Sequence, residues 1–203
     1  MRDYDGKTAA ERVAERRESL VDAGLELFGT CGYSGTSIRA VLREAGLQDR
    51  YFGESFADLD DLLAAVQDRL LDEELAACHA AVEATSGGSE AARAVADTVT
   101  RMFEKDPRHA RIKLHESLAG GPRTHQQRQV ANYSFADLLA EQLPPASKRS
   151  KREPDRRMLA LGLVAAGYEL MIAWHDDKQI SRAEAVDFVM VLFDALAAHL
   201  AHR

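Results

Sequence analysis

Residues 20–56, LVDAGLELFGTCGYSGTSIRAVLREAGLQDRYFGESF, consist of three short apolar segments separated by residues that favour turns. Glycine is common just after a helix ends, and threonine or serine is common where the next helix begins. The spacing therefore predicts a helix-turn-helix, whose second helix presents polar side chains to the major groove of DNA. The separators are Gly32-Tyr33, Thr36-Ser37 and Ala45-Gly46-Leu47.

Outside this stretch, apolar residues recur three and four positions apart, and alternating strand-like runs are scarce. That periodicity is typical of amphipathic helices, so we expect an all-α fold with about nine helices. Residues 85–89 and 143–154, rich in glycine, serine or proline, are expected to interrupt the helices. The expected helices cover residues 11–30, 38–45, a brief segment from 48 or 49, 58–84, 90–105, 107–119, 122–142, 155–177 and 181–202.

The chain of 203 residues contains two cysteines, Cys31 and Cys78, and no CxxC motif. A disulfide framework is therefore not expected, and a reducing, cytoplasmic location fits best. Cys31 is expected to be a buried structural thiol. The first residues lack the apolar core of a signal peptide. Residues 158–174 are apolar but fall short of a membrane span, so we expect a buried helix and no membrane association.

The net charge of −7 argues against a protein that coats nucleic acid through bulk attraction. Residues 1–60 contain eight Lys or Arg and twelve Asp or Glu, so the expected DNA-binding region is itself acidic. A local DNA-reading surface remains compatible with this charge. For the basic run of Lys148, Arg149, Lys151 and Arg152, a solvated loop is a simpler explanation than a nucleic-acid contact.

The order of the N-terminal residues sharpens the prediction. They are Leu20-Val21, Ala23-Gly24, Leu27-Phe28, Gly32-Tyr33, Thr36-Ser37-Ile38, Val41, Ala45-Gly46-Leu47, Phe52, Phe56 and Leu62-Leu63. In this order they resemble the N-terminal domain of the TetR family of transcriptional regulators, over about residues 17–66. The resemblance implies a homodimeric, all-α repressor with a helix-turn-helix DNA-binding domain at residues 1–57 and a ligand-binding and dimerisation domain at residues 58–203. In such a protein, a small-molecule effector in the second domain changes the spacing of two heads that read operator DNA.

The resemblance places Leu47, Phe52 and Phe56 in the core and other residues on the side that faces DNA. Arg50 is expected to bind a phosphate or a guanine edge, and Tyr51 a phosphate or a thymine methyl group. The candidate DNA-binding residues are Ser37, Arg39, Gln48, Asp49, Arg50, Tyr51 and Ser55. A further group either reaches flanking phosphates or forms an ordinary solvated helix face, namely Arg12, Arg16 and Arg17.

Two positions depart from the family pattern. The family commonly has tyrosine where Gly53 stands and lysine where Leu59 stands, and both usually contact phosphate. The neighbouring Asp58, Asp60 and Asp61 suit the start of a helix but would repel a phosphate. We therefore expect a weakened or unusually specific DNA contact.

A ligand cavity in a helical bundle needs apolar walls and a few polar groups. Tyr168, Met171 and His175 stand at helical spacing in the helix that usually lines the pocket in the resembled family, although ordinary core packing is the simpler explanation of such a stripe. The candidates for contact with an apolar or aromatic effector are Phe103, His115, Tyr133, Tyr168, Met171 and His175. The sequence has no HxxxH, HExxH, GxSxG or glycine-rich phosphate loop, so we expect neither an enzyme, nor a metal site, nor a cofactor.

The last two expected helices favour a homodimer, in which they form a four-helix bundle with their copies in a second subunit. Gly162 and Ala166 allow close approach of helix backbones, and a broad apolar stripe follows in the final helix. Packing of both helices inside one subunit is the alternative. For function, the alternative is a TetR-like ligand-binding or protein-interaction dimer that has lost operator recognition. The stripe consists of Val189, Leu192, Phe193, Leu196 and Leu200.

Overall fold

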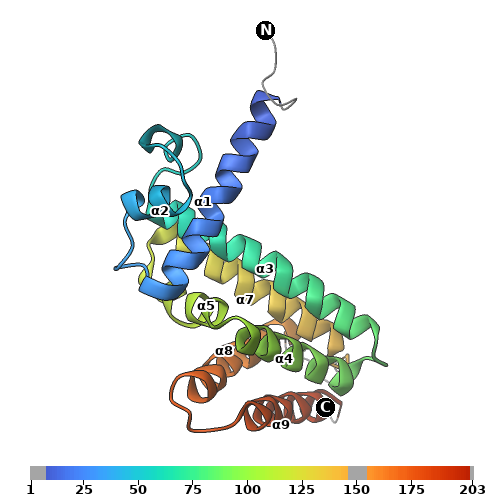
Figure 1. Cartoon of the computed structure of the whole chain (residues 1–203). Helices are drawn as coiled ribbons and strands as arrows, with labels where there is room; N and C mark the ends of the chain where they lie inside the picture. The colour runs from blue at the N-terminus through green and yellow to red at the C-terminus, as the bar shows by residue number, and fades with distance from the viewer. Residues whose placement is uncertain (1–7, 146–154, 202–203) are drawn as a thin grey trace. The chain divides into compact units, whose positions relative to one another are not determined.

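The computed structural model describes residues 8–145 and 155–201, which form helices and turns without a strand (Figure 1). The all-α prediction is therefore confirmed. The basic run at residues 148–152 lies outside the described residues. Over the described ranges the nine α-helices are α1 (Ala9–Cys31), α2 (Ile38–Glu44), α3 (Leu59–Glu83), α4 (Gly88–Lys105), α5 (Pro107–Arg111), α6 (Ser117–Ala119), α7 (Pro122–Gln142), α8 (Arg156–His175) and α9 (Arg182–Ala201), with two short turns, η1 (Asp49–Tyr51) and η2 (Ile112–Glu116).

The helix starts follow the local chemistry of the sequence. Thr8 and Glu11 form a capping box at the start of α1, where each side chain bonds the other residue's backbone N–H. Ser37 caps α2 by accepting the Ala40 N–H at 3.2 Å. Gly46, with a φ of 66°, follows α2 in the left-handed conformation that glycine adopts most readily. These signals explain why the predicted and observed helix boundaries agree closely here.

The described chain divides into two compact units, and α3 and α7 contribute residues to both. The N-terminal unit comprises Met1–Leu70 and Pro107–Gln127. Its core includes the fully buried Leu20, Phe28 and Val41. Gly24 lets α1 approach α3 closely, because a Cβ atom there would lie 3.0 Å from Val66 Cγ2. This core holds α1, α2 and the start of α3 in a fixed arrangement.

The N-terminal unit is larger than the predicted domain of residues 1–57, because α5, η2 and α6 pack with it. Arg108 Nη1 lies 2.6 Å from Glu26 Oε2, and Arg111 Nη1 donates to the Thr30 carbonyl at 2.6 Å. The single helix expected over residues 107–119 is interrupted by the π-helical turn η2. Cys31 is exposed at the end of α1, so the expectation of a buried thiol there is wrong.

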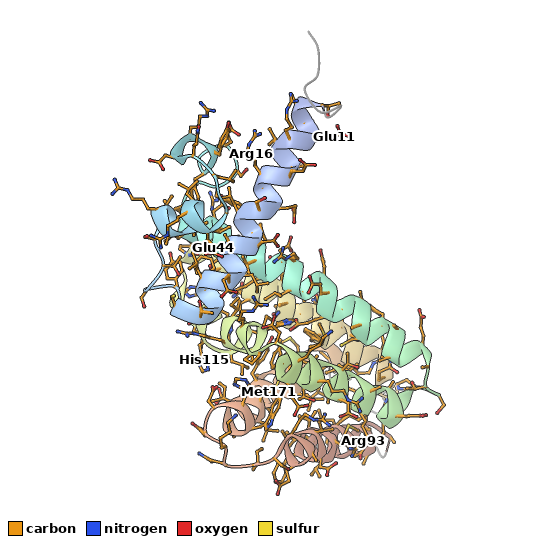
Figure 2. All side chains as sticks on the ribbon, viewed as in Figure 1. Glu11, Arg16, Glu44, Arg93, His115 and Met171 are labelled. Carbon is orange, nitrogen blue, oxygen red and sulfur yellow. The ribbon has the colours of Figure 1, made fainter. Side chains whose placement is uncertain are left out.

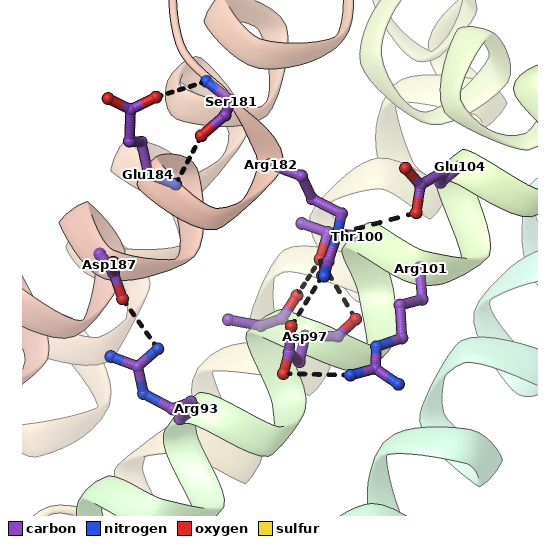
Figure 3. Close-up of polar contacts among 10 residues, drawn as sticks. Arg93, Asp97, Thr100, Arg101, Glu104, Ser181, Arg182, Glu184 and Asp187 are labelled. Carbon is purple, nitrogen blue, oxygen red and sulfur yellow. Dashed lines mark hydrogen bonds and ion pairs between the residues drawn. The ribbon is translucent and has the colours of Figure 1, made fainter.

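The C-terminal unit comprises Leu71–Asp106 and Arg128–Arg203, and within it α9 packs against both α8 and α4. Figure 3 shows the polar contacts between α4 and α9. Arg93 Nη1 donates to Asp187 Oδ1 at 2.8 Å, and Arg182 Nη1 donates to Asp97 Oδ1 at 2.7 Å. These pairs are partly exposed, so each adds little stability by itself, but together they fix how α9 aligns on α4.

By length and composition alone, α8 could cross a membrane, and 28% of its most apolar window is buried in the fold. One such helix is weak evidence for a membrane protein, because core helices of soluble proteins meet the same criteria. The helix is less buried than the sequence predicted. Met158 is 53% exposed, and on the neighbouring α9 Val191 is 65% exposed. The two helices therefore share an apolar surface that packing inside one subunit does not cover.

Candidate functional site

The recognition segment, which we define as residues 47–56, follows α2. Gln48 is extended, with φ −82° and ψ 154°, and the single 3-10 turn η1 comes next. Residues 52–55 form further turns, so the brief third helix that the sequence predicted is not a regular α-helix. Gly53 lies in these turns, and glycine disfavours an α-helix by about 1 kcal/mol relative to alanine. The segment presents its side chains from a short, irregular turn.

Most of the candidate DNA-binding side chains are open to solvent. Tyr51 and Ser55 are half-buried, and Ser37 is exposed but already serves as the N-cap of α2. Its hydroxyl therefore has a structural role that is sufficient to explain its position. The other exposed members of the set are Arg39, Gln48, Asp49 and Arg50.

Arg16 joins α1 to the recognition segment (Figure 2). Its Nη2 donates to Glu54 Oε2 at 2.8 Å, and its guanidinium lies 4.5 Å from the centre of the Tyr51 ring. Arg50 Nη2 donates to the Tyr51 hydroxyl at 2.7 Å, which raises the pKa of Arg50. A tyrosine hydroxyl that accepts a bond from arginine still has its own hydrogen to donate. The cluster thus presents two cations and one O–H group, which suit a phosphate oxygen, beside the carboxylate of Glu54.

The acidic residues after the recognition segment accept hydrogen bonds from backbone N–H groups near the start of α3. Asp58 Oδ1 accepts the Asp61 N–H at 2.9 Å, and Asp61 Oδ2 accepts the Ala57 N–H at 2.9 Å. The other Asp61 oxygen lies 2.5 Å from Arg123 Nη1. The acidic groups that were expected to repel phosphate therefore have structural partners in the N-terminal unit, and their effect on DNA binding stays a prediction.

Asp60, at 8% exposure, caps the start of α7 from a distance in sequence. Its Oδ1 accepts the N–H groups of Gly121 at 2.8 Å and Thr124 at 3.1 Å, and its Oδ2 accepts the Arg123 N–H at 2.9 Å. Burial opposes ionisation of this carboxyl, but the hydrogen bonds prevail and lower its pKa below the ordinary value. The start of α3, directly after the recognition segment, is thereby tied to the N-terminus of α7.

A second clamp holds the turn between α1 and α2. Glu116 Oε2 accepts the Tyr33 N–H at 2.7 Å, and Glu116 Oε1 accepts Arg111 Nε–H at 3.0 Å. Arg111 also binds the Thr30 carbonyl at the end of α1. Since Glu116 belongs to η2, the π-helical turn fixes the connection between α1 and α2 from a segment distant in sequence.

An apolar cavity of about 60 Å³ lies inside the C-terminal unit, between α3, α4, α7, α8 and α9. Three of the predicted ligand-binding residues line it, namely Phe103, Tyr168 and Met171. Phe135 and Glu74 also line it, and Glu74 was not predicted from the sequence. The signal for Glu74 was present in the sequence, because it stands at helical spacing after the buried Leu70.

The other three predicted ligand-binding residues do not line this cavity. His115 is exposed on η2 in the N-terminal unit, where Figure 2 labels it. Tyr133 is 36% exposed, and the Arg157 guanidinium lies 4.6 Å from the centre of its ring. His175 ends α8, and its Nδ1 lies 2.8 Å from Asp176 Oδ1. Their role in ligand binding stays a prediction that the cavity does not support.

The chain thus combines an N-terminal helical unit with a C-terminal helical unit that contains an apolar cavity. No model of a known protein family matches the chain. The transcriptional activator FasR of Mycolicibacterium smegmatis is 26% identical over 175 residues, which cover 85% of this chain and 78% of FasR.

Solved structures give the same architecture. A Syntrophomonas wolfei protein assigned to the TetR family superposes with a TM-score of 0.72 at 16% identity, covering 91% of this chain and 96% of the other. The transcriptional regulator FadR of Bacillus subtilis, in complex with stearoyl-CoA, also superposes with a TM-score of 0.72 at 16% identity, covering 87% of this chain and 96% of FadR. The chain therefore has the fold of the TetR family of transcriptional regulators, and the resemblance predicted from the sequence is confirmed.

Proposed function

We propose that the chain is a homodimeric, cytoplasmic DNA-binding transcriptional regulator whose binding to operator DNA responds to a small apolar or aromatic effector. The observation that carries the proposal is the recognition segment, whose exposed Gln48, Asp49 and Arg50 stand beside the Arg16–Tyr51 contact. Arginine and glutamine read base edges and bind phosphates, so this set can both position DNA and discriminate its sequence. That FasR and FadR are named as transcriptional regulators supports regulation rather than catalysis.

The cavity supports the response to an effector. It lies between five helices and is lined mainly by apolar side chains, as small-molecule sites in helical bundles commonly are. FadR of Bacillus subtilis was solved with stearoyl-CoA, a ligand with a long apolar chain. At about 60 Å³, the cavity is smaller than the roughly 150 Å³ that holds benzene in an engineered protein core, so an effector must move side chains to enter.

The apolar surface of α8 and α9 supports the homodimer. Met158 and Gly162 of α8 and Leu192 and Leu196 of α9 line a shallow groove on this surface. Val191, which precedes Leu192 in the sequence, is 65% exposed. Exposed apolar patches of this kind mark association surfaces, and a two-fold axis would let each pair of helices cover its copy.

A selection of bound sequences from random DNA, followed by fluorescence anisotropy with the selected site, tests DNA binding by the full chain. We expect sequence-selective binding that weakens steeply between about 50 and 200 mM salt, because phosphate contacts release counterions. Binding that is absent, or indifferent to sequence, would contradict the proposal. We further propose release from DNA by the effector, as for a repressor. A promoter–reporter assay decides that direction, since FasR is named an activator.

A second candidate function is a ligand-binding or protein-interaction dimer without operator recognition. The single turn η1 favours it, because a regular recognition helix would give more contacts with the major groove. The candidates differ in one measurement. The second predicts a stable dimer with a ligand response but no selective enrichment from random DNA.

A further inference from the structure

The lining of the cavity in the C-terminal unit contains an acidic side chain. Glu74, on α3, lines it with only 1% of its surface exposed. Among the described residues that line the cavity, none is Lys, Arg or His. The nearby Cys78, one helical turn further on, adds no charge, because burial and then the negative charge of Glu74 raise its pKa to about 12.

A carboxylate accepts hydrogen bonds and donates none, with about four acceptor positions on its two oxygens. A carboxylate that already accepts bonds within the protein can therefore still accept one from a ligand. A cationic donor gains most, because charge-assisted hydrogen bonds are roughly twice as strong as neutral ones and the buried site has little water to screen the attraction. A ligand carboxylate would bring a like charge to Glu74 and be disfavoured.

Three aromatic rings support the same ligand chemistry independently. Phe103, Phe135 and Tyr168 line the cavity from three helices, α4, α7 and α8. The face of an aromatic ring attracts a cation within about 6 Å of its centre, and the attraction grows when water is excluded. The remaining lining is aliphatic, including Ala92, Ala96 and Gly167, and so suits an apolar body.

We propose that the effector is an apolar amine, whose ammonium group is bound by Glu74 and whose hydrocarbon or aromatic body packs between α4, α7 and α8. This inference rests on the proposed function, because it assigns a ligand class to the effector cavity. It separates this chain from FadR, which was solved with stearoyl-CoA, a thioester without a cationic group on its acyl chain. Glu74 is then the residue that determines ligand specificity.

The test uses three molecules that differ only in the head group: 4-phenylbutylamine, 4-phenylbutan-1-ol and 4-phenylbutyrate. Isothermal titration calorimetry of the full-length chain measures their affinities at pH 7, where the amine is protonated and the acid is ionised. We expect the amine to bind about tenfold or more tightly than the alcohol, and the acid to bind most weakly.

Glu74→Gln keeps the size of the side chain and removes its charge. We expect this variant to bind the amine and the alcohol within about threefold of each other, while the control Glu73→Gln, an exposed residue of the same helix, keeps the preference of the unmodified chain. Circular dichroism checks that each variant folds. If Glu74→Gln does not fold, the ranking of head groups by the unmodified chain still decides.

A stronger response to the alcohol or the acid, an amine preference that survives Glu74→Gln, or no binding of any of the three would overturn the inference. Operator binding, measured separately without these molecules, shows whether the proposed function stands. A chain that binds DNA selectively and responds to the acid retains the proposed function and loses only the amine as its ligand.

Discussion

Arg50 combines an exposed guanidinium with a hydrogen bond to Tyr51, and that bond fixes where the cation lies. We expect Arg50→Ala to weaken operator binding by roughly tenfold, because a charge-assisted contact to phosphate or guanine is lost. Fluorescence anisotropy at several salt concentrations measures both possibilities. If Arg50 binds a phosphate, its loss lowers the slope of affinity against salt by about one. If it binds a guanine, its loss relaxes selectivity at one base pair.

The matched control is Arg101→Ala. Arg101 is an exposed arginine of the C-terminal unit, and its Nη2 lies 3.6 Å from Asp97 Oδ2 on the preceding turn of α4. Its replacement should leave operator affinity unchanged while removing the same charge from the chain. Equal losses in both variants would assign the effect to net charge, and no loss in either would reject the assigned role of Arg50.

Asp60 provides a pH-dependent contribution to stability. Its pKa is lower in the folded chain than in the unfolded chain, so ionised Asp60 stabilises the fold above the unfolded value near 3.8, and this contribution is lost as the pH falls through the lower folded value. We expect Asp60→Asn to reduce the free energy of unfolding by about 1 kcal/mol at pH 7. An asparagine amide can point only one oxygen at the N–H groups that the two carboxylate oxygens accept. Urea denaturation at pH 7 and pH 3 measures the loss.

Asp58→Asn is the control for this substitution. Asp58 accepts one N–H, that of Asp61, and asparagine is about as good an N-cap as aspartate. The control should change stability by less than about half as much. If the two variants lose the same stability at pH 7, the cap on α7 does not need both oxygens of Asp60.

Individual residues differ in how well the sequence predicts their surroundings. The buried Leu20, Phe28 and Val41 follow directly from helical spacing, because one periodic stripe must face the core. The bond between Glu116 and the Tyr33 N–H joins residues 83 positions apart, and no local pattern reveals it. Arg16 was expected either to reach flanking phosphates or to lie on a solvated helix face, and its contact with Tyr51 depends on the packing of α1.

Gly53 of the recognition segment is exposed and surrounded by open space. No atom lies within 4 Å of the point where a Cβ would stand. An alanine fits there without strain and restricts the unfolded chain. We expect Gly53→Ala to raise the free energy of unfolding by about 0.4–1 kcal/mol, as measured by urea denaturation.

Gly46, between α2 and the recognition segment, is the contrasting case. Its surroundings are equally open, but its φ of 66° lies in the left-handed region. Gly46→Ala should therefore destabilise the fold by about 1 kcal/mol, since an L-residue is strained in that conformation. Opposite signs for the two alanines would identify backbone conformation as the cause, whereas equal signs would contradict the reasoning for Gly53.

Gly53→Tyr tests the departure from the family pattern directly. The resemblance implies that a tyrosine at this position contacts phosphate, and the open space around Gly53 accommodates the ring. We expect operator affinity to rise by roughly threefold to tenfold in the anisotropy assay, as one phosphate contact is added. Unchanged affinity would mean that the turn geometry of the segment keeps the ring away from DNA.

At the scale of elements, capping residues and periodicity were sufficient to predict α1, α2, α4 and α7 to within a few residues. The π-helical turn η2 was not predictable, because its wider hydrogen bonding is set by tertiary contacts such as those of Glu116 and Arg111. The short η1 was only partly foreseen. The sequence placed its start near Asp49, but whether Gly53 ends the helix depends on the surrounding packing.

At the scale of the whole chain, the sequence suggested a division after residue 57, where the helix-turn-helix pattern ends. The N-terminal unit instead also takes in Pro107–Gln127. The contacts of Arg108 with Glu26 and of Asp60 with the start of α7 join segments that are 82 and more than 60 residues apart. Such pairings depend on topology, and a single sequence does not disclose them.

We expect two copies of the chain to associate through the apolar surface of α8 and α9. Val191 is 65% exposed on α9, and a two-fold axis would bury it in both subunits. Val191→Glu should raise the dimer dissociation constant by at least about a hundredfold, because each interface would contain two unpaired buried carboxylates. Sedimentation velocity at micromolar concentration measures the change, and operator affinity should fall with it.

Val130→Glu is the matched control, because Val130 is 46% exposed on α7, in the same unit but on another helix. Each change replaces an exposed valine with glutamate, so a general effect of added charge would appear in both variants. A dimer lost only in Val191→Glu assigns the interface to α8 and α9. If Val191→Glu remains dimeric and Val130→Glu dissociates, the subunits associate through α7, and the spacing of the two recognition segments must be set by that helix instead.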